Sequence, residues 1–219
     1  MQIEAILWDM DGVLLDTERL CQQAFVEVNT PLHLFDNPAQ SYLETIGLNR
    51  DSTLQWYTKV EPSLAQCERY YGAVRDRLLE LIETDLQVKP GVEQALTYFK
   101  QQGLPQMVVT SSHSEQARLK LERTGLLDYF TALIGGDQVS CGKPHPEPYL
   151  AAASLLNVSP EHCLVIEDSA NGVKAGLAAG AQVVHVPDLL ATSNDWRDQL
   201  AVALDSLALL PDWFAGRGE

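Results

Sequence analysis

Two carboxylates, Asp9 and Asp11, stand two residues apart at the end of the apolar run Ile3–Trp8. Carboxylates at this spacing on an extended chain face opposite ways, but Gly12 permits a turn that could bring both into one pocket. Crowded carboxylates are unfavourable unless a cation or a proton compensates. Mg²⁺ suits them because it prefers carboxylate and phosphate oxygens. The pattern predicts a magnesium site, although a strand ending in a polar turn would look the same.

A second pair of acids, Glu167 and Asp168, follows the apolar run Cys163–Ile166, and Ser169 comes next. If this run and the first one form neighbouring strands, Asp168 and Asp9 flank one crevice and could share a cation. The alternative is that Asp168 or Ser169 merely caps the following helix, which is a common role for both residue types. The two interpretations are compatible.

Hydroxyl groups and a lysine complete the set of candidate residues. Thr110, Ser111 and Ser112 follow a third apolar run, where hydroxyls and backbone N–H groups at a helix start suit a phosphate oxyanion. Lys143 precedes Pro144 in a proline-rich loop that restrains it, so its charge could pair with a carboxylate and a phosphate. An ordinary helix cap and a solvated surface lysine are the simpler alternatives.

Alternating strands and helices are expected to position these residues. The predicted buried strands are Ile3–Trp8, Gln106–Thr110, Ala132–Ile134, Cys163–Ile166 and Gln182–Val186. The predicted helices begin near Val92, Ser114, Pro146 and Ser169 and end near Gly103, Thr124, Leu156 and Ala179. Strands that alternate with helices indicate an α/β fold with a doubly wound parallel sheet, in which ligands bind beyond the carboxyl ends of the strands.

The segment from Thr17 to Val88 interrupts this alternation. It has no convincing strand and carries long helical patterns, for example over Tyr71–Glu83. We therefore expect a Rossmann-like core domain, residues 1–16 and 89–219, with an inserted α-helical domain, residues 17–88. The tail Pro211–Glu219 is expected to be frayed.

Composition narrows the classes of partner. The 219 residues carry a formal net charge of −15, which disfavours nucleic acid and anionic membranes as partners. The sequence shows no secretory signal and no long apolar span, and its four cysteines match no zinc pattern. These features predict a cytoplasmic protein, and we expect a monomer.

The order of these motifs resembles the haloacid dehalogenase (HAD) superfamily, in its helical-capped phosphatase and beta-phosphoglucomutase-like branch. The matching stretches are DMDGVLLDTE (Asp9–Glu18), VVTSS (Val108–Ser112), GKPHPEPY (Gly142–Tyr149) and IEDSANGVKAG (Ile166–Gly176). The inserted helical segment lies where that branch has its cap domain. The resemblance implies a Rossmann-like HAD core and a phosphatase acting through an aspartyl phosphate.

The resemblance also implies a role for each catalytic residue. Asp9 would be the nucleophile, and Asp11 would be the general acid and base. Thr110 and Ser111 would bind the transferring phosphoryl group, and Lys143 would neutralise its charge. A carboxylate nucleophile divides one difficult displacement into two easier ones, so these residue types suit phosphoryl transfer.

The implied cofactor is Mg²⁺. Its ligands would be Asp9, Asp168 and the backbone carbonyl of Asp11, with Glu167 supporting the ion through water. In the helical segment, Gly47 and Arg50 resemble the substrate-reading motif of the branch, and Arg50 would contact the far end of the substrate.

The expected substrate is a small phosphorylated metabolite, and by the resemblance a sugar or sugar-alcohol phosphate. The nearest alternative is a beta-phosphoglucomutase-type phosphomutase. That family has a hinge histidine where this chain has Cys21, and a lysine where it has Thr45, which favours the phosphatase. An alternative of another class is a non-enzymatic phospho-switch or binding protein, although no core motif residue is missing.

Overall fold

The computed structural model describes residues 2–46, 48 and 50–218. The chain divides into two compact units, residues 1–15 with 88–219 and residues 16–87. We call them the sheet unit and the helical unit and describe each by itself. Their assignment as a core domain and a cap domain stays a prediction.

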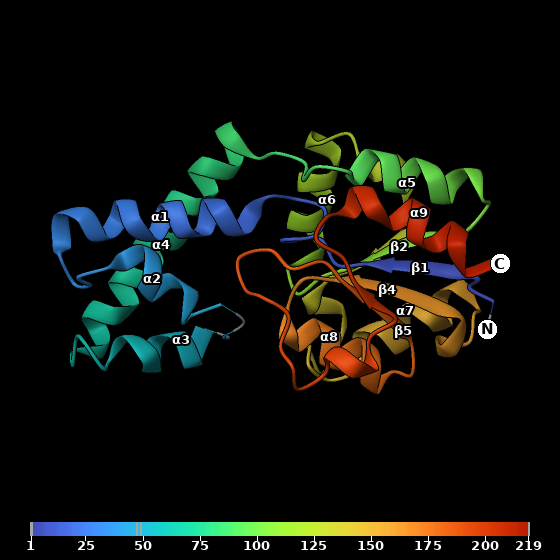
Figure 1. Ribbon diagram of the computed structural model, residues 1–219. Helices are drawn as coiled ribbons and strands as arrows, with labels where there is room; N and C mark the ends of the chain where they lie inside the picture. The colour runs from blue at the N-terminus through green and yellow to red at the C-terminus, as the bar shows by residue number, and fades with distance from the viewer. Residues whose placement is uncertain (1, 47, 49, 219) are drawn as a thin grey trace. The chain divides into compact units, whose positions relative to one another are not determined.

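The sheet unit is built on a parallel sheet of six strands in the order β3-β2-β1-β4-β5-β6 (Figure 1). The strands are β1 (Ala5–Trp8), β2 (Gln106–Val109), β3 (Ala132–Ile134), β4 (Cys163–Glu167), β5 (Gln182–His185) and β6 (Val202–Ala203). Leu7 of β1 pairs with Met107 of β2 and with Val165 of β4. This order confirms the doubly wound α/β fold and makes the first and fourth strands neighbours.

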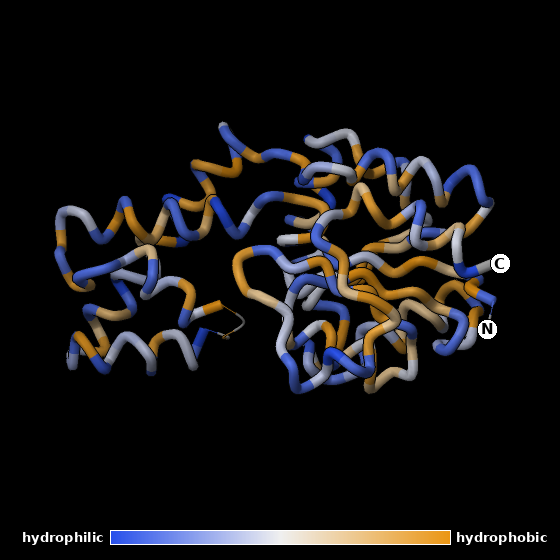
Figure 2. The backbone as a smooth tube through the Cα atoms, viewed as in Figure 1, coloured by the Kyte–Doolittle hydropathy of each residue, from blue (hydrophilic) through white to orange (hydrophobic). Residues whose placement is uncertain are grey.

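Helices cover both faces of this sheet, which explains why its central strands are apolar throughout. The helices are α5 (Val92–Gln101), α6 (Ser114–Arg123), α7 (Glu147–Leu156), α8 (Ala170–Ala178) and α9 (Leu210–Ala215). In Figure 1, α5 and α9 lie on one side of the sheet and α7 and α8 on the other. Figure 2 shows that the strands form the most continuous hydrophobic part of the chain.

The two layers of the core use alternate residues of each strand. Leu7 belongs to the cluster under α7 and α8, together with Tyr149 and Val173. Trp8 packs instead against Phe99 of α5, with ring centroids 5.9 Å apart. The indole N–H of Trp8 donates to Gln106 Oε1 at 3.0 Å, so this polar group stays satisfied within the core.

The prediction of a frayed tail is wrong for most of its length, because α9 runs from Leu210 to Ala215. Leu210 is fully buried, and the ring of Phe214 packs edge-on against Phe99 at 5.0 Å. The helix is therefore stabilised by tertiary packing, which a short local pattern cannot reveal. The short strand β6 was not predicted for the same reason.

The helical unit contains α1 (Thr17–Leu32), α2 (Pro38–Leu43), α3 (Arg50–Tyr57) and α4 (Leu64–Asp85). Its described residues form no strand, as the sequence predicted. Six aromatic residues form an aromatic cluster at its centre: Phe25, Phe35, Tyr42, Trp56, Tyr57 and Tyr70. Phe25 is 1% exposed and contacts Phe35, Tyr57 and Tyr70, so it is the centre of this small core.

Short 3-10 turns connect several elements: Leu127–Tyr129, Gly136–Gln138, Pro160–His162, Arg197–Gln199, Leu207–Leu209 and Gly216–Gly218. Within the described part of the chain, no helix is both long enough and apolar enough to cross a membrane.

Candidate active site

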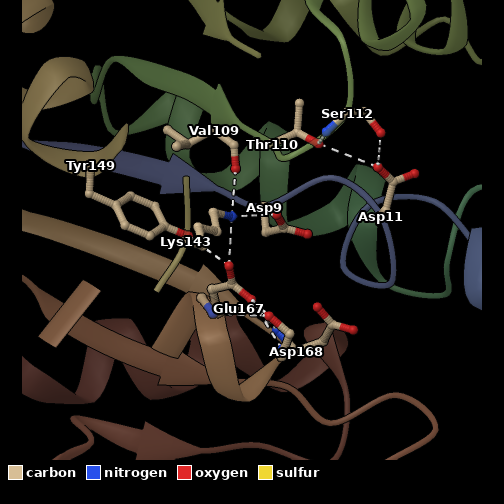
Figure 3. A network of polar contacts seen from close by, with 11 residues as sticks. Asp9, Asp11, Val109, Thr110, Ser112, Lys143, Tyr149, Glu167 and Asp168 are labelled. Carbon is tan, nitrogen blue, oxygen red and sulfur yellow. Dashed lines mark hydrogen bonds and ion pairs between the residues drawn. The ribbon is translucent and has the colours of Figure 1, made fainter. Parts of the chain in front are cut away.

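The candidate residues meet at the carboxyl ends of β1, β2 and β4 (Figure 3). Asp9 directly follows β1, Thr110 directly follows β2, and Glu167 is the last residue of β4. The N–H of Asp9 donates to Ile166 O at 3.0 Å, and the N–H of Thr110 donates to Ile134 O at 2.9 Å. Ladder hydrogen bonds between strands thus hold the backbone of the site.

Lys143 is the central cation of this site. Its ammonium group donates to Asp9 Oδ1 at 2.5 Å, to Val109 O at 2.8 Å and to Glu167 Oε1 at 2.7 Å. The three acceptors match the three donors of an ammonium group, and the side chain is only 5% exposed. The alternative of a solvated surface lysine is therefore wrong.

Glu167 is fully buried and anchors several neighbours. Its Oε1 accepts from Lys143 at 2.7 Å and from the Tyr149 hydroxyl at 2.8 Å. Its Oε2 accepts from the N–H of Asp168 at 3.0 Å and from the N–H and Oγ of Ser169 at 3.1 Å. Five donors thus hold one carboxylate, and a cation that bound it directly would have to displace some of them. An indirect, supporting role suits this geometry better.

The pKa values of Asp9, Lys143 and Glu167 are shifted by burial and by one another's charges. Burial, reinforced by the charge of Glu167, raises the pKa of the Asp9 carboxyl well above its ordinary value, although Lys143 opposes it. Burial disfavours the charge of Lys143, but Asp9 and Glu167 outweigh it and raise the pKa of the ammonium group. Burial also raises the pKa of Glu167, yet Lys143 and the hydrogen bonds outweigh it, and the pKa is lowered. A further cation beside Asp9 would oppose the effect of burial on the pKa of that carboxyl.

A divalent cation fits the acids around Asp9. Asp9, Glu167 and Asp168 each offer a carboxylate oxygen, and these oxygens lie within 4.8 Å of one another. Gly12 has a φ of +87°, and a Cβ on it would lie 2.2 Å from Asp168 Oδ2, so only glycine leaves room for this carboxylate. An all-oxygen donor set of this kind suits a hard ion such as Mg²⁺.

Asp11 has its own set of donors on the other side of the site. Lys120 Nζ lies 2.7 Å from Asp11 Oδ1, and Ser112 Oγ donates to Asp11 Oδ2 at 2.7 Å. Thr110 Oγ1 donates to the same oxygen at 3.3 Å. Figure 3 shows Asp11 facing Thr110 and Ser112 rather than Lys143.

Lys120 was missed by sequence reasoning, and Ser112 was named only as a hydroxyl suited to a phosphate, without its contact with Asp11. Lys120 lies on α6 between the buried positions Ala117 and Leu121, so helical periodicity could have placed it near the core. Ser112 contacts Asp11, whereas Ser111 is exposed, so the structure does not bring Ser111 to this carboxylate. The phosphate-binding role of Ser111 stays a prediction.

Two further predicted site residues, Gly47 and Arg50, belong to the helical unit, which is described by itself. Gly47 lies outside the described residues. Arg50 begins α3 and forms ion pairs with Asp51 and Glu68, both at 3.3 Å, while its side chain is 55% exposed. Exposed pairs of this kind are weak and easily exchanged for a ligand. The substrate-reading role of both residues stays a prediction.

Helix capping explains part of the local sequence. Ser169 Oγ accepts from the N–H of Gly172 at 3.1 Å and is the N-cap of α8. Asp137 accepts from the N–H of Ser114 at 2.6 Å and from its hydroxyl at 2.8 Å, at the start of α6. Ser169 therefore caps a helix and also binds Glu167, whereas the cation shared by Asp9 and Asp168 stays a prediction.

The family model of haloacid dehalogenase-like hydrolases matches residues 3–180. The chain belongs to this family. The match contains all the strand-end acids of the site, Lys143 and the whole helical unit, and it confirms the family resemblance of the motifs.

Two proteins named as phosphatases and one solved HAD family hydrolase are similar to the chain over most of its length. It is 34% identical to hexitol phosphatase B of Escherichia coli K12 over 95% of both chains. It is 32% identical to a phosphorylated carbohydrates phosphatase of Thermotoga maritima over 84% of both. A HAD family hydrolase from Deinococcus radiodurans, solved with bound phosphate and sodium, superposes with a TM-score of 0.84 at 27% identity, over 99% of this chain and 96% of that one. These relatives confirm the prediction of a phosphatase enzyme.

Proposed function

We propose that this protein hydrolyses a sugar or sugar-alcohol phosphate with the help of Mg²⁺, through an aspartyl phosphate on Asp9. The observation that carries the proposal is the buried Lys143, which joins Asp9 and Glu167 at the carboxyl end of the sheet, with Asp11 beside Thr110. The substrate class is supported by the hexitol and carbohydrate phosphatases that the chain resembles.

In the first step, a carboxylate oxygen of Asp9 attacks phosphorus. Lys143 binds Oδ1, so we assign the attack to Oδ2. The new Oδ2–P bond forms as the bond from phosphorus to the leaving oxygen breaks. The electron pair goes to that oxygen, which takes a proton from Asp11. Thr110 and Lys143 would stabilise the charge on the transferring phosphoryl group.

In the second step, Asp11 accepts a proton from water, and the water oxygen attacks phosphorus. The Oδ2–P bond breaks, inorganic phosphate leaves and the Asp9 carboxylate is restored. The same carboxyl group acts first as an acid and then as a base, so its proton is returned in each cycle.

The residues that would hold Mg²⁺ are Asp9, Asp168 and the Asp11 carbonyl, with Glu167 as support. When bound, the ion would neutralise the crowded carboxylates and the phosphoryl charge. Since burial raises the pKa of Asp9, a neighbouring cation also suits its ionisation.

A panel of phosphorylated metabolites tests this proposal, assayed with Mg²⁺ and with excess EDTA. We expect release of phosphate from hexose or hexitol phosphates, loss of activity in EDTA and recovery when Mg²⁺ is restored. Full activity in EDTA would contradict the metal assignment. Absence of hydrolysis across the panel would contradict the phosphatase assignment.

Phosphorus NMR separates the phosphatase from the phosphomutase. A mutase would convert beta-glucose 1-phosphate to glucose 6-phosphate, given a trace of the bisphosphate, without matching release of phosphate. We expect hydrolysis, because Cys21 and Thr45 stand where the mutase has histidine and lysine. The Thr45 hydroxyl donates to Tyr42 O at 2.7 Å and thus serves the local fold of the helical unit.

We also propose that the protein acts as a monomer in the cytoplasm. The high negative charge makes copies of the chain repel one another at moderate salt, which favours the monomer. Light scattering after size exclusion would test the oligomeric state.

A further inference from the structure

Lys120 contacts Asp11 although no family motif of this chain contains it. Its side chain is 13% exposed, and its Nζ lies 2.7 Å from Asp11 Oδ1. The neighbouring Leu119 of the same helix is 58% exposed, and Leu121 is fully buried. Ordering a long lysine side chain and removing it from water both cost free energy. A cation at this position could stabilise the helix while remaining exposed, so helix stability does not explain the contact with Asp11.

The geometry points to Lys120 as a positioning residue for the acid–base carboxylate of Asp11. This inference rests on the function proposed above and extends it to a residue outside the recognised motifs. Lys120 acts through Asp11 and needs no contact with the substrate.

The division of donors between the two oxygens of Asp11 supports this role. Ser112 and Thr110 both bind Oδ2. Both of these donors are neutral hydroxyl groups, and both lie on one side of the carboxylate. Lys120 binds the other oxygen, Oδ1, so that donors on both oxygens hold the carboxylate in one orientation. Because its hydrogen bond is charge-assisted, it is stronger than a bond from a neutral hydroxyl.

Different parts of the fold hold the backbone and the carboxylate of Asp11. Ser112 lies in the loop between β2 and α6, and Lys120 lies on α6 itself. One helix and its leading loop therefore approach Asp11 with two different groups. The turn at Gly12 holds the backbone near Asp11, since the N–H of Gly12 donates to Leu15 O at 2.9 Å. The backbone and the carboxylate of Asp11 are thus held by separate contacts.

The test replaces Lys120 by methionine, which has a similar length and no charge, and by arginine, which keeps the charge. With a sugar phosphate we expect kcat of Lys120→Met to fall about tenfold, with KM almost unchanged, because misoriented catalytic groups cost one to two orders of magnitude. Lys120→Arg should recover much of this loss. Arg118→Met, on the same helix and 59% exposed, is the control and should match the wild type.

The dependence on the leaving group separates positioning from a general structural role. p-Nitrophenolate needs little protonation, so a rapid burst of it should appear at the wild-type rate in Lys120→Met. The following hydrolysis of the phosphoenzyme should slow, because water activation still needs Asp11. A structural defect would slow both phases.

A double-mutant cycle with Asp11→Asn provides the decisive readout. If Lys120 acts through Asp11, adding Lys120→Met to Asp11→Asn should cause no further loss of kcat. Losses that multiply in the double variant would overturn the inference, as would a Lys120→Met enzyme that equals the wild type on a sugar phosphate. Where Lys120→Met folds poorly, Lys120→Gln serves in its place.

A crystal structure keeps the inference separate from the proposed function. We expect the Asp11 carboxylate in Lys120→Met to turn away from the orientation seen here, while Asp9 and Lys143 keep theirs. An unchanged Asp11 would overturn the positioning role, whatever the substrate. Lack of hydrolysis by the wild type, with a turned Asp11 in the variant, would contradict the phosphatase assignment alone.

Discussion

At the scale of single residues, the site separates two carboxylates that stand close in sequence. Asp9 is paired with Lys143, and Asp11 is paired with Lys120. Each carboxylate therefore has its own lysine. This division suits a nucleophile and an acid–base group that must act on different atoms of one phosphate ester.

We expect Asp9→Asn to abolish turnover without unfolding the protein, because an amide cannot accept a phosphoryl group and return it to water. Lys143 would keep Glu167 and Val109 O as partners, so the melting temperature should not fall. Phosphate release and acid-quench detection of the phosphoenzyme are the measurements. Asp128→Asn, an exposed acid elsewhere, is the control. Turnover by a clean Asp9→Asn preparation would remove Asp9 from its role.

His185 predicts a dependence of stability on pH. Its ring is 1% exposed, its Nε2 bonds Asp168 O at 2.8 Å, and burial lowers its pKa below the ordinary 6.5. The folded state therefore resists the proton that the unfolded state takes up below pH 6.5. Its contribution to the free energy of unfolding is complete above pH 6.5. That contribution falls as the pH drops towards the folded-state pKa.

Urea denaturation between pH 7.5 and pH 5 checks this expectation. His185→Gln should lose less stability than the wild type over this interval, whereas the exposed His33→Gln should follow the wild type. Parallel curves for His185→Gln and the wild type would contradict the assignment of a neutral buried histidine.

At the scale of elements, the junction of β4 with α8 supports the catalytic network. Gly172 lies in α8, and a Cβ on it would lie 1.6 Å from Glu167 Oε1. The side chain of Glu167 passes over this glycine to reach Lys143 and Tyr149. The helix α8 thus supports the site because Gly172 has no side chain that would occupy the space of Glu167.

Gly172→Ala tests this junction. In a helix, glycine to alanine usually stabilises by about 1 kcal/mol. Here the opposite sign is expected, because alanine must displace Glu167 and with it Lys143, so both stability and kcat should fall. Gly72→Ala in α4 is the matched control, since no atom lies within 4 Å of its would-be Cβ. Equal stabilisation by both substitutions would show that Glu167 can be displaced without consequence.

The sequence predicted strands and helices better than it predicted contacts between residues far apart in the chain. The long buried runs were predicted well, as for Gln106–Thr110, which forms β2 over Gln106–Val109, because burial on both faces leaves an unbroken apolar pattern. The helix α9 was missed because its packing on Phe99 depends on a residue far away in the chain. Lys120 was missed for a related reason. Periodicity places it on a face of α6, but only the folded chain shows which carboxylate that face meets.

At the scale of the whole molecule, thirty acidic and fifteen basic residues should repel an anionic substrate. We expect kcat/KM for a sugar phosphate to rise with ionic strength at constant free Mg²⁺, since salt screens exposed charges beyond about 8 Å. The constant kcat should change little, because the site charges are buried. Rates measured from 20 to 300 mM of an inert salt check this (roughly the range over which screening develops). A fall in kcat/KM would indicate that local cations dominate the approach.

The boundary between the two units has a consequence for how the chain folds. Within the sheet unit, Lys89 N donates to Leu14 O at 3.0 Å, and Leu15 pairs with Val88. Within the helical unit, Asp16 N donates to Gln87 O at 3.0 Å. Residues 16–87 therefore form a loop whose ends are held together. Closing this loop costs conformational entropy, which opposes the pairing of β1 with β2. The packing of α1 against α4 brings the two ends of this segment together when it folds. A helical unit weakened at Phe25 should then delay formation of the sheet, although no residue of the sheet has changed.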